Sequence, residues 1–381
     1  MPEFPKHERQ TGAPRSRVLT PAAWRVLSAT MTHDSISRRR FLSSTLTAAA
    51  AAPFGAGIAF AADADPTVLG QGKFRYRRVP DFSLRKDGGE VKVKDCHEFA
   101  RTRSGSMILC TTHTDNNLIE FSPDGKVIRT FGTTYPGIHG LNISDENGEE
   151  FLWITDTERR IVVKLDMKGK EVMTLGWPKD SGKYEKEQQF CPTETAVNPA
   201  NGDIYVADGY GSNWLTHYDA KGALKGAYRH EGFNCIHGVA YDNRDAADPR
   251  LLVTSRAANK LFTLSLDGKN LGHVDFPGAW ICRPVVRGEN LFFAVINSGR
   301  LSWGSDFRGF VMVLDKDNKP VALIGGTPPT AGAEGESALY RNLEPKPFLN
   351  CHDVHLDPEG NLYVAHWNSK QTQPYKLVPV A

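Results

Sequence analysis

The body of this 381-residue chain lacks any long apolar run, contains only six cysteines and has almost no net charge, +2 at neutral pH. The first shortage argues against a membrane-spanning helix beyond the N-terminal region. The near-neutral balance gives no support for nucleic-acid binding. Glycine, in contrast, is plentiful, with 35 residues, and 40% of the chain is hydrophobic. This composition indicates a globular protein rich in turns.

The N-terminal region has the pattern of an export signal. The sequence SRRRFL at 37–42 precedes an alanine-rich apolar stretch at 46–62, and AFA at 59–61 supplies a cleavage signal. An arginine pair before Phe-Leu resembles the twin-arginine signal, which exports folded proteins. A general secretory signal and a membrane anchor are the alternatives, although the apolar run is short for a span. We expect residues 1–61 to be a signal with an extended N-region, with Met1 or Met31 as the start, and the mature protein to be periplasmic or secreted.

Removal of residues 1–61 changes the charge of the chain. It takes away eight Lys or Arg and three Asp or Glu, so the net charge moves from +2 to −3. The six cysteines of an exported protein allow three interpretations, which are disulfides, buried thiols and a metal or redox role. Five of them, at 96, 191, 235, 282 and 351, fall at or just before the start of an expected inner strand.

One sequence motif recurs through the mature chain: an apolar strand, a polar turn, and a second strand that ends in a small or polar residue. Its clearest copies are HEFARTRSGSMILCTT at 97–112, HGLNISDENGEEFLWITD at 139–156, TETAVNPANGDIYVAD at 193–208, HGVAYDNRDAADPRLLVTS at 237–255 and HDVHLDPEGNLYVAH at 352–366. A weaker sixth copy begins at Arg283. Third and fourth strands joined by Asp-Gly or Lys-Gly turns follow the copies, as at 117–125 and 261–268.

Four antiparallel strands in each repeat make one blade of a β-propeller. The repeats start 42, 54, 44, 46 and 69 residues apart, near the roughly 40–50 residues of a blade. The pattern resembles NHL repeats and predicts an all-β, six-bladed propeller over residues 62–381. The last repeat supplies only three strands, so we expect residues 74–77 or 82–84 to add the fourth and close the ring.

Three histidines occupy the same repeat position in alternate blades. His139, His237 and His352 each begin an inner strand, in blades 2, 4 and 6. Side chains at equivalent positions of alternate blades converge on the axis. Three imidazoles with one open position are typical of catalytic zinc, although copper, iron and nickel also accept them. We therefore predict a zinc-like metal site at the axis, against the alternative that these are packed histidines.

The motifs IHGL at 138–141, FCPT at 190–193, VADGY at 206–210, IHGV at 236–239 and CHDV at 351–354 make blades 2 to 6 similar to the peptidyl-α-hydroxyglycine α-amidating lyases. Those propellers cleave the N–C bond of a C-terminal hydroxyglycine and release an amide. The resemblance implies that His139, His237 and His352 bind zinc. It also implies that Tyr210 and Arg256 are catalytic, a role consistent with a tyrosine base and a carboxylate-binding guanidinium. A rim aromatic and a solvated surface charge are the alternatives for these two residues.

The same resemblance implies a calcium ion on the axis, with the Asp353 side chain and the backbones of Leu141 and Phe99 as ligands. The chain also departs from the family. In blade 1 the family's second substrate-binding arginine is replaced by CTTH at 110–113. The repeat alignment instead predicts three residues near the axis or rim that would favour an anionic substrate: His97, Arg283 and His366.

Two connections, at 176–189 and 325–349, are long for a compact fold, and we interpret them as walls of a cleft or as loose insertions. The first functional hypothesis is an exported, metal-dependent carbon–nitrogen lyase, expected to be a monomer acting on a small-molecule or peptide substrate. The second is a non-catalytic NHL propeller that binds a protein or peptide. The third is a lactonase-like hydrolase, which the histidines disfavour because such sites prefer oxygen ligands.

Overall fold

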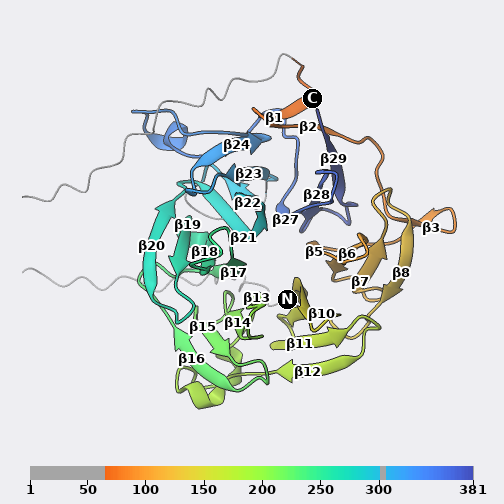
Figure 1. Cartoon of the computed structure of the whole chain (residues 1–381). Helices are drawn as coiled ribbons and strands as arrows, with labels where there is room; N and C mark the ends of the chain where they lie inside the picture. Colours follow the sequence, from red (N-terminus) through yellow and green to blue (C-terminus); the bar gives the residue numbers. More distant parts are fainter. Residues whose placement is uncertain (1–64, 301–305, 381) are drawn as a thin grey trace, which may run out of the picture. The chain divides into compact units, whose positions relative to one another are not determined.

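The computed structural model describes residues 65–300 and 306–380, and within these ranges six antiparallel sheets stand around one axis (Figure 1). The all-β, six-bladed propeller expected from the repeats is confirmed. The expected export signal, residues 1–61, lies outside the described residues. In the described part of the chain, no helix has the length and apolar character needed to cross a membrane.

The first three blades each have four strands in chain order from the axis outward. Blade 1 contains β5 (Cys96–Arg101), β6 (Met107–Thr111), β7 (Leu118–Phe121) and β8 (Val127–Phe131). Blade 2 contains β9 (Ile138–Glu146), β10 (Glu149–Asp156), β11 (Ile161–Asp166) and β12 (Glu171–Leu175). Blade 3 contains β13 (Glu194–Val197), β14 (Ile204–Ala207), β15 (Leu215–Tyr218) and β16 (Leu224–Tyr228).

Blades 4 and 5 repeat this order, and blade 6 differs in its outer half. Blade 4 contains β17 (Ile236–Asp242), β18 (Arg250–Ser255), β19 (Lys260–Leu264) and β20 (Asn270–Asp275). Blade 5 contains β21 (Ala279–Arg287), β22 (Asn290–Ser298), β23 (Phe310–Leu314) and β24 (Pro320–Ile324). Blade 6 contains β27 (Cys351–Leu356), β28 (Leu362–His366) and β29 (Tyr375–Pro379), followed by β2 (Phe74–Arg78) and β1 (Val68–Gln71).

The N-terminal strand β2 closes the ring. It pairs antiparallel with β29, with Tyr76 opposite Pro379 and Arg78 opposite Leu377. The first of the two expected closing segments, 74–77, is therefore correct, and the second, 82–84, forms no strand. The sequence pattern did not predict β1, which adds a fifth strand to blade 6 outside β2.

Six apolar clusters hold the blades together, one between each pair of neighbours. Strand β22 shows why its sequence is almost wholly apolar. Phe292 and Ala294 pack toward blade 6, whereas Leu291 and Phe293 pack toward blade 4. Because side chains alternate between the two faces of a strand, a strand with a blade on each side buries both sets.

Short elements complete the connections. They are two strand pairs and four 3-10 helices: β3 (Arg85–Lys86) with β4 (Gly89–Glu90), β25 (Gly326–Thr327) with β26 (Arg341–Asn342), η1 (Lys179–Ser181), η2 (Glu187–Gln189), η3 (Arg256–Ala258) and η4 (Gly335–Ala338). The long connection at 176–189 carries η1 and η2, and the one at 325–349 carries β25, η4 and β26. Both are therefore folded segments, and neither is a loose insertion.

The six cysteines are free thiols, five of them buried and Cys235 partly exposed. Burial raises the pKa of Cys191 and Cys282 to about 12, so both remain protonated at neutral pH. The structure thus supports the buried-thiol interpretation over disulfides.

Candidate metal centre

Irregularities in the inner strands direct the histidines toward the axis. The pairing register shifts between Ile236 and Gly238 in blade 4 and between Cys351 and Asp353 in blade 6, so each shift spans a histidine. Blade 1 shows the same shift around His97. Such a β-bulge turns one residue out of the ladder and re-aims its side chain. The bulge therefore explains why a histidine at this repeat position points to the centre of the ring.

Each bulge also removes an amide from the ladder, and a side chain from the second strand replaces its partner. The Gly140 amide donates to Thr155 Oγ1 (2.7 Å) in blade 2, and the Gly238 amide donates to Thr254 Oγ1 (2.9 Å) in blade 4. In blade 1 the acceptor is Cys110 Sγ, 3.3 Å from the Glu98 amide. Cys110, in the segment 110–113, therefore has a structural role.

Four histidines meet at the axis, and we call them the histidine layer: His97, His139, His237 and His352. Ligand atoms of the first, second and fourth lie within 4.8 Å of one another. The His237 Nε2 atom lies 3.2 Å from His139 Nε2. His97, expected to bind substrate, thus joins the three histidines expected to bind metal, and all four are at most 2% exposed.

Backbone carbonyls fix two of the rings. His139 Nδ1 donates to the Thr193 carbonyl (2.8 Å), and His352 Nδ1 donates to the His97 carbonyl (3.1 Å). Because a carbonyl oxygen only accepts, Nδ1 carries the proton in both rings and Nε2 keeps its lone pair. This outer hydrogen bond is the usual support of a metal-binding histidine.

The histidines are neutral and incompletely hydrogen bonded. Burial lowers the pKa of His139, His237 and His352 well below the usual value, and it lowers that of His97 to about 3. Among the described residues, no hydrogen-bond partner reaches either nitrogen of His97, Nε2 of His352 or Nδ1 of His237. Buried polar atoms normally have partners. The donor set therefore fits a transition-metal ion. The distance of 3.2 Å between Nε2 of His139 and Nε2 of His237 is close to the spacing of about 3.3 Å between two nitrogens bound to one tetrahedral zinc ion.

Tyr210 and Arg256 cover this layer. The Tyr210 hydroxyl lies 3.2 Å from Nε2 of both His139 and His237, and Arg256 Nη2 donates to it (3.0 Å). The Tyr210 residue is 44% exposed, whereas Arg256 is 6% exposed. Burial raises the pKa of the Tyr210 hydroxyl, and the Arg256 guanidinium opposes that rise. Nε and Nη1 of Arg256 are buried and have no hydrogen-bond partner in the described part of the chain.

Hydrogen bonds of Asp208 and Ser212 hold the turn that carries Tyr210. The Asp208 carboxylate accepts from the amides of Cys191 (2.6 Å) and Ser212 (2.7 Å), and burial raises the pKa of Asp208 to about 7. Ser212 Oγ donates to the Gln189 carbonyl (3.0 Å) at the end of the 176–189 connection. This long connection therefore supports the Tyr210 turn.

Arg283 lies in a second polar group, which we call the guanidinium layer: Arg283, Glu98, Glu194 and Asp353. Arg283 makes two hydrogen bonds to Asp353, Nε to Oδ1 (2.9 Å) and Nη2 to Oδ2 (2.8 Å). Its Nη1 lies 3.2 Å from Glu98 and 3.9 Å from Glu194. Burial raises the pKa of all three carboxyl groups, and Arg283 opposes the rise.

The guanidinium layer corrects two expectations. Arg283 was aligned with the histidines, but its guanidinium is satisfied by protein oxygens and is not available to substrate. The register explains this, because ICR at 281–283 matches IHG at 236–238, so Cys282 holds the histidine position. A one-residue shift reverses side-chain direction. The oxygens expected to bind calcium, on Asp353, Leu141 and Phe99, instead accept hydrogen bonds from Arg283.

His366 is not part of the axial site. It is fully buried in blade 6, with ring centroids 4.3 Å from Tyr375 and 6.3 Å from Phe348. The side chain faces the packed side of β28 and not the rim, so the substrate-binding role expected for it does not fit its position.

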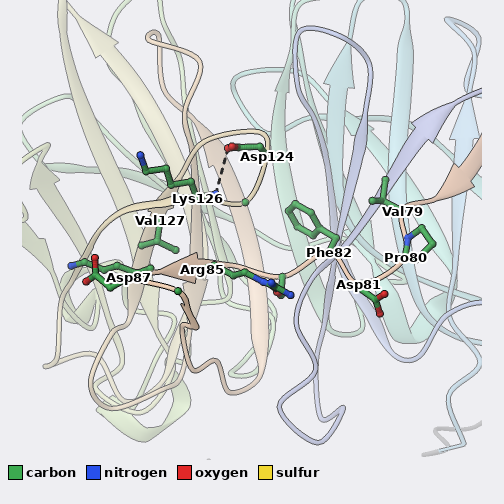
Figure 2. A pocket seen from close by; sticks show the side chains of 13 residues that line it. Val79, Pro80, Asp81, Phe82, Arg85, Asp87, Asp124, Lys126 and Val127 are labelled. Atoms are coloured by element: carbon green, nitrogen blue, oxygen red, sulfur yellow. Dashed lines mark hydrogen bonds between the residues drawn. The ribbon is translucent and has the colours of Figure 1, made fainter.

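A groove of about 750 Å³ lies apart from the axis, between the segment 79–88 and the turn at 124–127 (Figure 2). In this turn the Lys126 amide donates to the Asp124 side chain (3.4 Å). The groove contains none of the expected site residues. The axial cluster therefore remains the candidate site.

Sequence reasoning missed Glu98 and Glu194. Both follow the histidine position of their repeats, as Asp353 does, and both are fully buried. The signal was an acidic residue at the second position of an otherwise apolar inner strand. Buried carboxylates at such a position require a cation, and Arg283 is that cation.

Fold and cluster together define a six-bladed propeller with a histidine-lined axial site. The chain resembles peptidyl-α-hydroxyglycine α-amidating lyases and NHL-repeat proteins. A probable amidating lyase of Caenorhabditis elegans is 42% identical over 106 residues, which are 27% of this chain and 29% of that protein. NHL repeat-containing protein 3 of Mus musculus is 26% identical over 283 residues, 68% of this chain and 72% of that protein. No family model matches the chain.

Solved structures agree on the fold. A gluconolactonase from Xanthomonas campestris has a TM-score of 0.55 at 12% identity and is covered over 95% of its length by 82% of this chain. A streptogramin B lyase has a TM-score of 0.51 at 12% identity, with coverage of 98% of its length and 82% of this chain. At this identity the likeness concerns the fold alone. The chain is thus related to propeller proteins that include lyases, although it matches under a third of the length of the amidating lyase from C. elegans.

Proposed function

We propose that this protein is an exported, metal-dependent lyase that cleaves the carbon–nitrogen bond of a hydroxylated amide bearing a carboxylate, as in an N-acyl-α-hydroxyglycine. The observation that carries the proposal is the Tyr210 hydroxyl, which lies within 3.2 Å of two axial histidines and 3.0 Å of Arg256. The similarity to amidating lyases supports the same chemistry.

In this proposal the histidine layer holds a zinc-like ion, with Nε2 of His139 and His352 directed by their carbonyl partners. Such an ion supplies a Lewis acid that polarises a substrate oxygen. His97 and His237 are the two candidates for the third protein ligand. Three ligands leave one position for substrate, the pattern of catalytic sites.

Arg256 and Tyr210 would bind the substrate and transfer its proton. The partly unpaired guanidinium of Arg256 binds the substrate carboxylate by parallel hydrogen bonds. Tyr210 would act as a base in its phenolate form, which the Arg256 guanidinium and a bound cation would stabilise against the effect of burial. Its Oη would accept the proton of the substrate hydroxyl as the C–N bond breaks and pass it to the released nitrogen. The released nitrogen gains a proton and leaves as an amide, and the carbon becomes the aldehyde of a two-carbon oxo acid. Atoms and charge balance without an oxidant.

Turnover of an N-acyl-α-hydroxyglycine by the metal-loaded protein tests the proposal. We expect Tyr210→Phe to lower kcat by about 100-fold or more while leaving the bound metal in place. Tyr228→Phe is the matched control, because Tyr228 Oη also contacts a histidine, 3.2 Å from His217 Nδ1, in the outer strand of the same blade. Equal activities of the two variants would remove Tyr210 from the mechanism.

Arg256→Lys separates substrate binding from proton transfer. Lysine keeps the charge but loses the planar fork, so we expect KM for the carboxylate substrate to rise more than kcat falls. The absence of turnover by wild-type protein that holds metal would reject this substrate class. The remaining candidate would then be a propeller that binds a partner without catalysis.

A further inference from the structure

The environment of Arg283 is the oxygen shell of a hard cation. Besides Asp353, its guanidinium donates to the carbonyls of Leu141, from Nη1 at 2.8 Å, and of Phe99, from Nη2. Carboxylates of Glu98 and Glu194 lie beside it. Carboxylate and carbonyl oxygens converging on one point are the ligands that calcium takes in proteins. One cation already occupies this point, and it belongs to the chain itself.

The guanidinium layer joins three blades by their backbones. Asp353 of blade 6 accepts from the Phe99 amide of blade 1 (2.9 Å), and Glu98 of blade 1 accepts from the Leu141 amide of blade 2 (2.8 Å). Arg283 of blade 5 then binds the carbonyls of the same two residues. Removal of the cation would leave neighbouring carboxylates buried without compensation.

The groups that Arg283 binds are adjacent in sequence to the histidine layer. Glu98 follows His97, Asp353 follows His352, and Leu141 lies two residues after His139. These three histidines are the ones whose ligand atoms lie within 4.8 Å of one another. The inner strands advance about 3.3 Å per residue, so a shift of the guanidinium layer moves the imidazoles with it.

Blade 4 packs closely against the backbone of Arg283. The opposing residue of blade 4 is Gly238, where a Cβ atom would lie 2.3 Å from Arg283 Cα. Gly238 of blade 4 is therefore in close contact with the Arg283 backbone, and no larger residue fits there. On the remaining side, a cavity of about 250 Å³ is lined by Arg283 together with Arg101, Arg287 and His355. This cavity borders the guanidinium layer.

We propose that Arg283 is a built-in replacement for a divalent cation: it holds the inner strands of blades 1, 2 and 6 together and positions His97, His139 and His352, so that the wild-type propeller needs no calcium. The proposal does not depend on the lyase function. It implies that the oxygens around Arg283 form a latent calcium site, which becomes available when the side chain is shortened.

Thermal unfolding with and without calcium tests this inference. We expect the Tm of the wild-type protein, freed of transition metal beforehand because EGTA also binds zinc, to stay within about 1 °C in 5 mM CaCl2 or 5 mM EGTA. Arg283→Ala retains the Cβ that packs on Gly238 and removes the charge, so its Tm in EGTA should fall by about 5 °C or more. Calcium should restore at least half of this loss, because it binds the folded state only.

The double variant Arg283→Ala, Asp353→Asn is the matched control. It lacks the carboxylate that makes two hydrogen bonds with Arg283, so calcium should restore little of its Tm. Recovery equal to that of the single variant would place the calcium elsewhere and overturn the proposal. A wild-type Tm that is lower in EGTA than in CaCl2, measured on protein already freed of transition metal, would overturn it as well, and this measurement requires no variant to fold.

A second readout separates positioning from general stability. In the single variant, calcium should also restore the affinity for Zn²⁺ measured by competition with a chromogenic chelator. A rise in Tm without recovered zinc affinity would limit Arg283 to a structural role. Absence of zinc binding by wild-type protein would instead reject the proposed function and leave the calcium result intact.

Discussion

The two polar layers on the propeller axis are built from neighbouring residues of the same strands, yet they differ in their charge: the guanidinium layer has its own cation, Arg283, among carboxylates, whereas the histidine layer is a group of imidazoles. In the guanidinium layer, oxygens of six protein groups surround Arg283, and Glu98 Oε1 and Glu194 Oε2 are the carboxylate oxygens there that lack a hydrogen-bond partner among the described residues. In the histidine layer, several buried nitrogens have no partner within the described residues. A buried guanidinium that pairs with carboxylates stabilises a fold, whereas a group of buried imidazoles whose nitrogens lack partners indicates a site for a metal ion.

The largest expected effect is in the guanidinium layer. Asp353→Asn breaks a buried ion pair and should lower the free energy of unfolding by about 3–5 kcal/mol. The exposed pair of Arg103 and Asp145 provides the control, since Asp145→Asn should cost less than about 1 kcal/mol. Urea denaturation of both variants measures the difference. Equal losses would mean that the guanidinium layer does not stabilise the axis.

Zinc should act on the other layer. At a hundred times its Kd, Zn²⁺ should stabilise the wild-type protein by about 2.7 kcal/mol, a rise in Tm of about 4 °C for a domain of this size. His97→Ala and His237→Ala decide which histidine is the third ligand, because only the variant that lacks the ligand should lose this rise. His217→Ala is the control, since His217 lies in an outer strand and is paired with Asp203. An undiminished rise in both axial variants would place the zinc outside the histidine layer.

Asp208, below Tyr210, should give a pH dependence. Its pKa in the folded protein is about 7, above the ordinary value of 3.8, so the folded state binds more protons than the unfolded state between these values. The stability that Asp208 contributes is therefore largest at low pH and is lost as the pH rises from about 4 to 7. Relative to Asp208→Asn, wild-type stability should fall by roughly 1–3 kcal/mol across this range. A constant difference would show that the Asp208 carboxyl titrates normally.

The smallest effect is expected at His97. Its nitrogens have no partner among the described residues, so His97→Leu removes no hydrogen bond of the metal-free protein. We expect the free energy of unfolding to change by less than about 1 kcal/mol or to rise. Unfolding in the presence of EDTA measures it. A loss as large as that of Asp353→Asn would make the two layers alike.

Much of the fold follows from local patterns in the sequence. The repeats predicted six blades, and the three-stranded last repeat predicted closure by residues 74–77 or 82–84, of which the first is correct, because turn chemistry and apolar alternation are local signals. The fifth strand of blade 6 was missed, since β1 pairs only with the closing strand and matches no repeat. Convergence of His139, His237 and His352 was also predictable, as equivalent positions meet on the axis.

The guanidinium layer could not be predicted from the repeats alone. A shift of one residue in blade 5 placed Arg283 among the histidines, and the bulges that decide side-chain direction depend on contacts between strands. The role of the Glu98 and Glu194 carboxylates becomes evident only from their contacts with Arg283. His366 was misplaced because its repeat position does not reveal which face of β28 packs against other side chains.

The metal content of the purified protein tests the central claim most directly. Elemental analysis of wild-type protein should find about one equivalent of a transition metal per chain, retained in His217→Ala and lost in His352→Ala. Metal-free wild-type protein that also fails to take up zinc, copper, iron or nickel on titration, or a full equivalent retained by His352→Ala, would contradict a metal centre in the histidine layer.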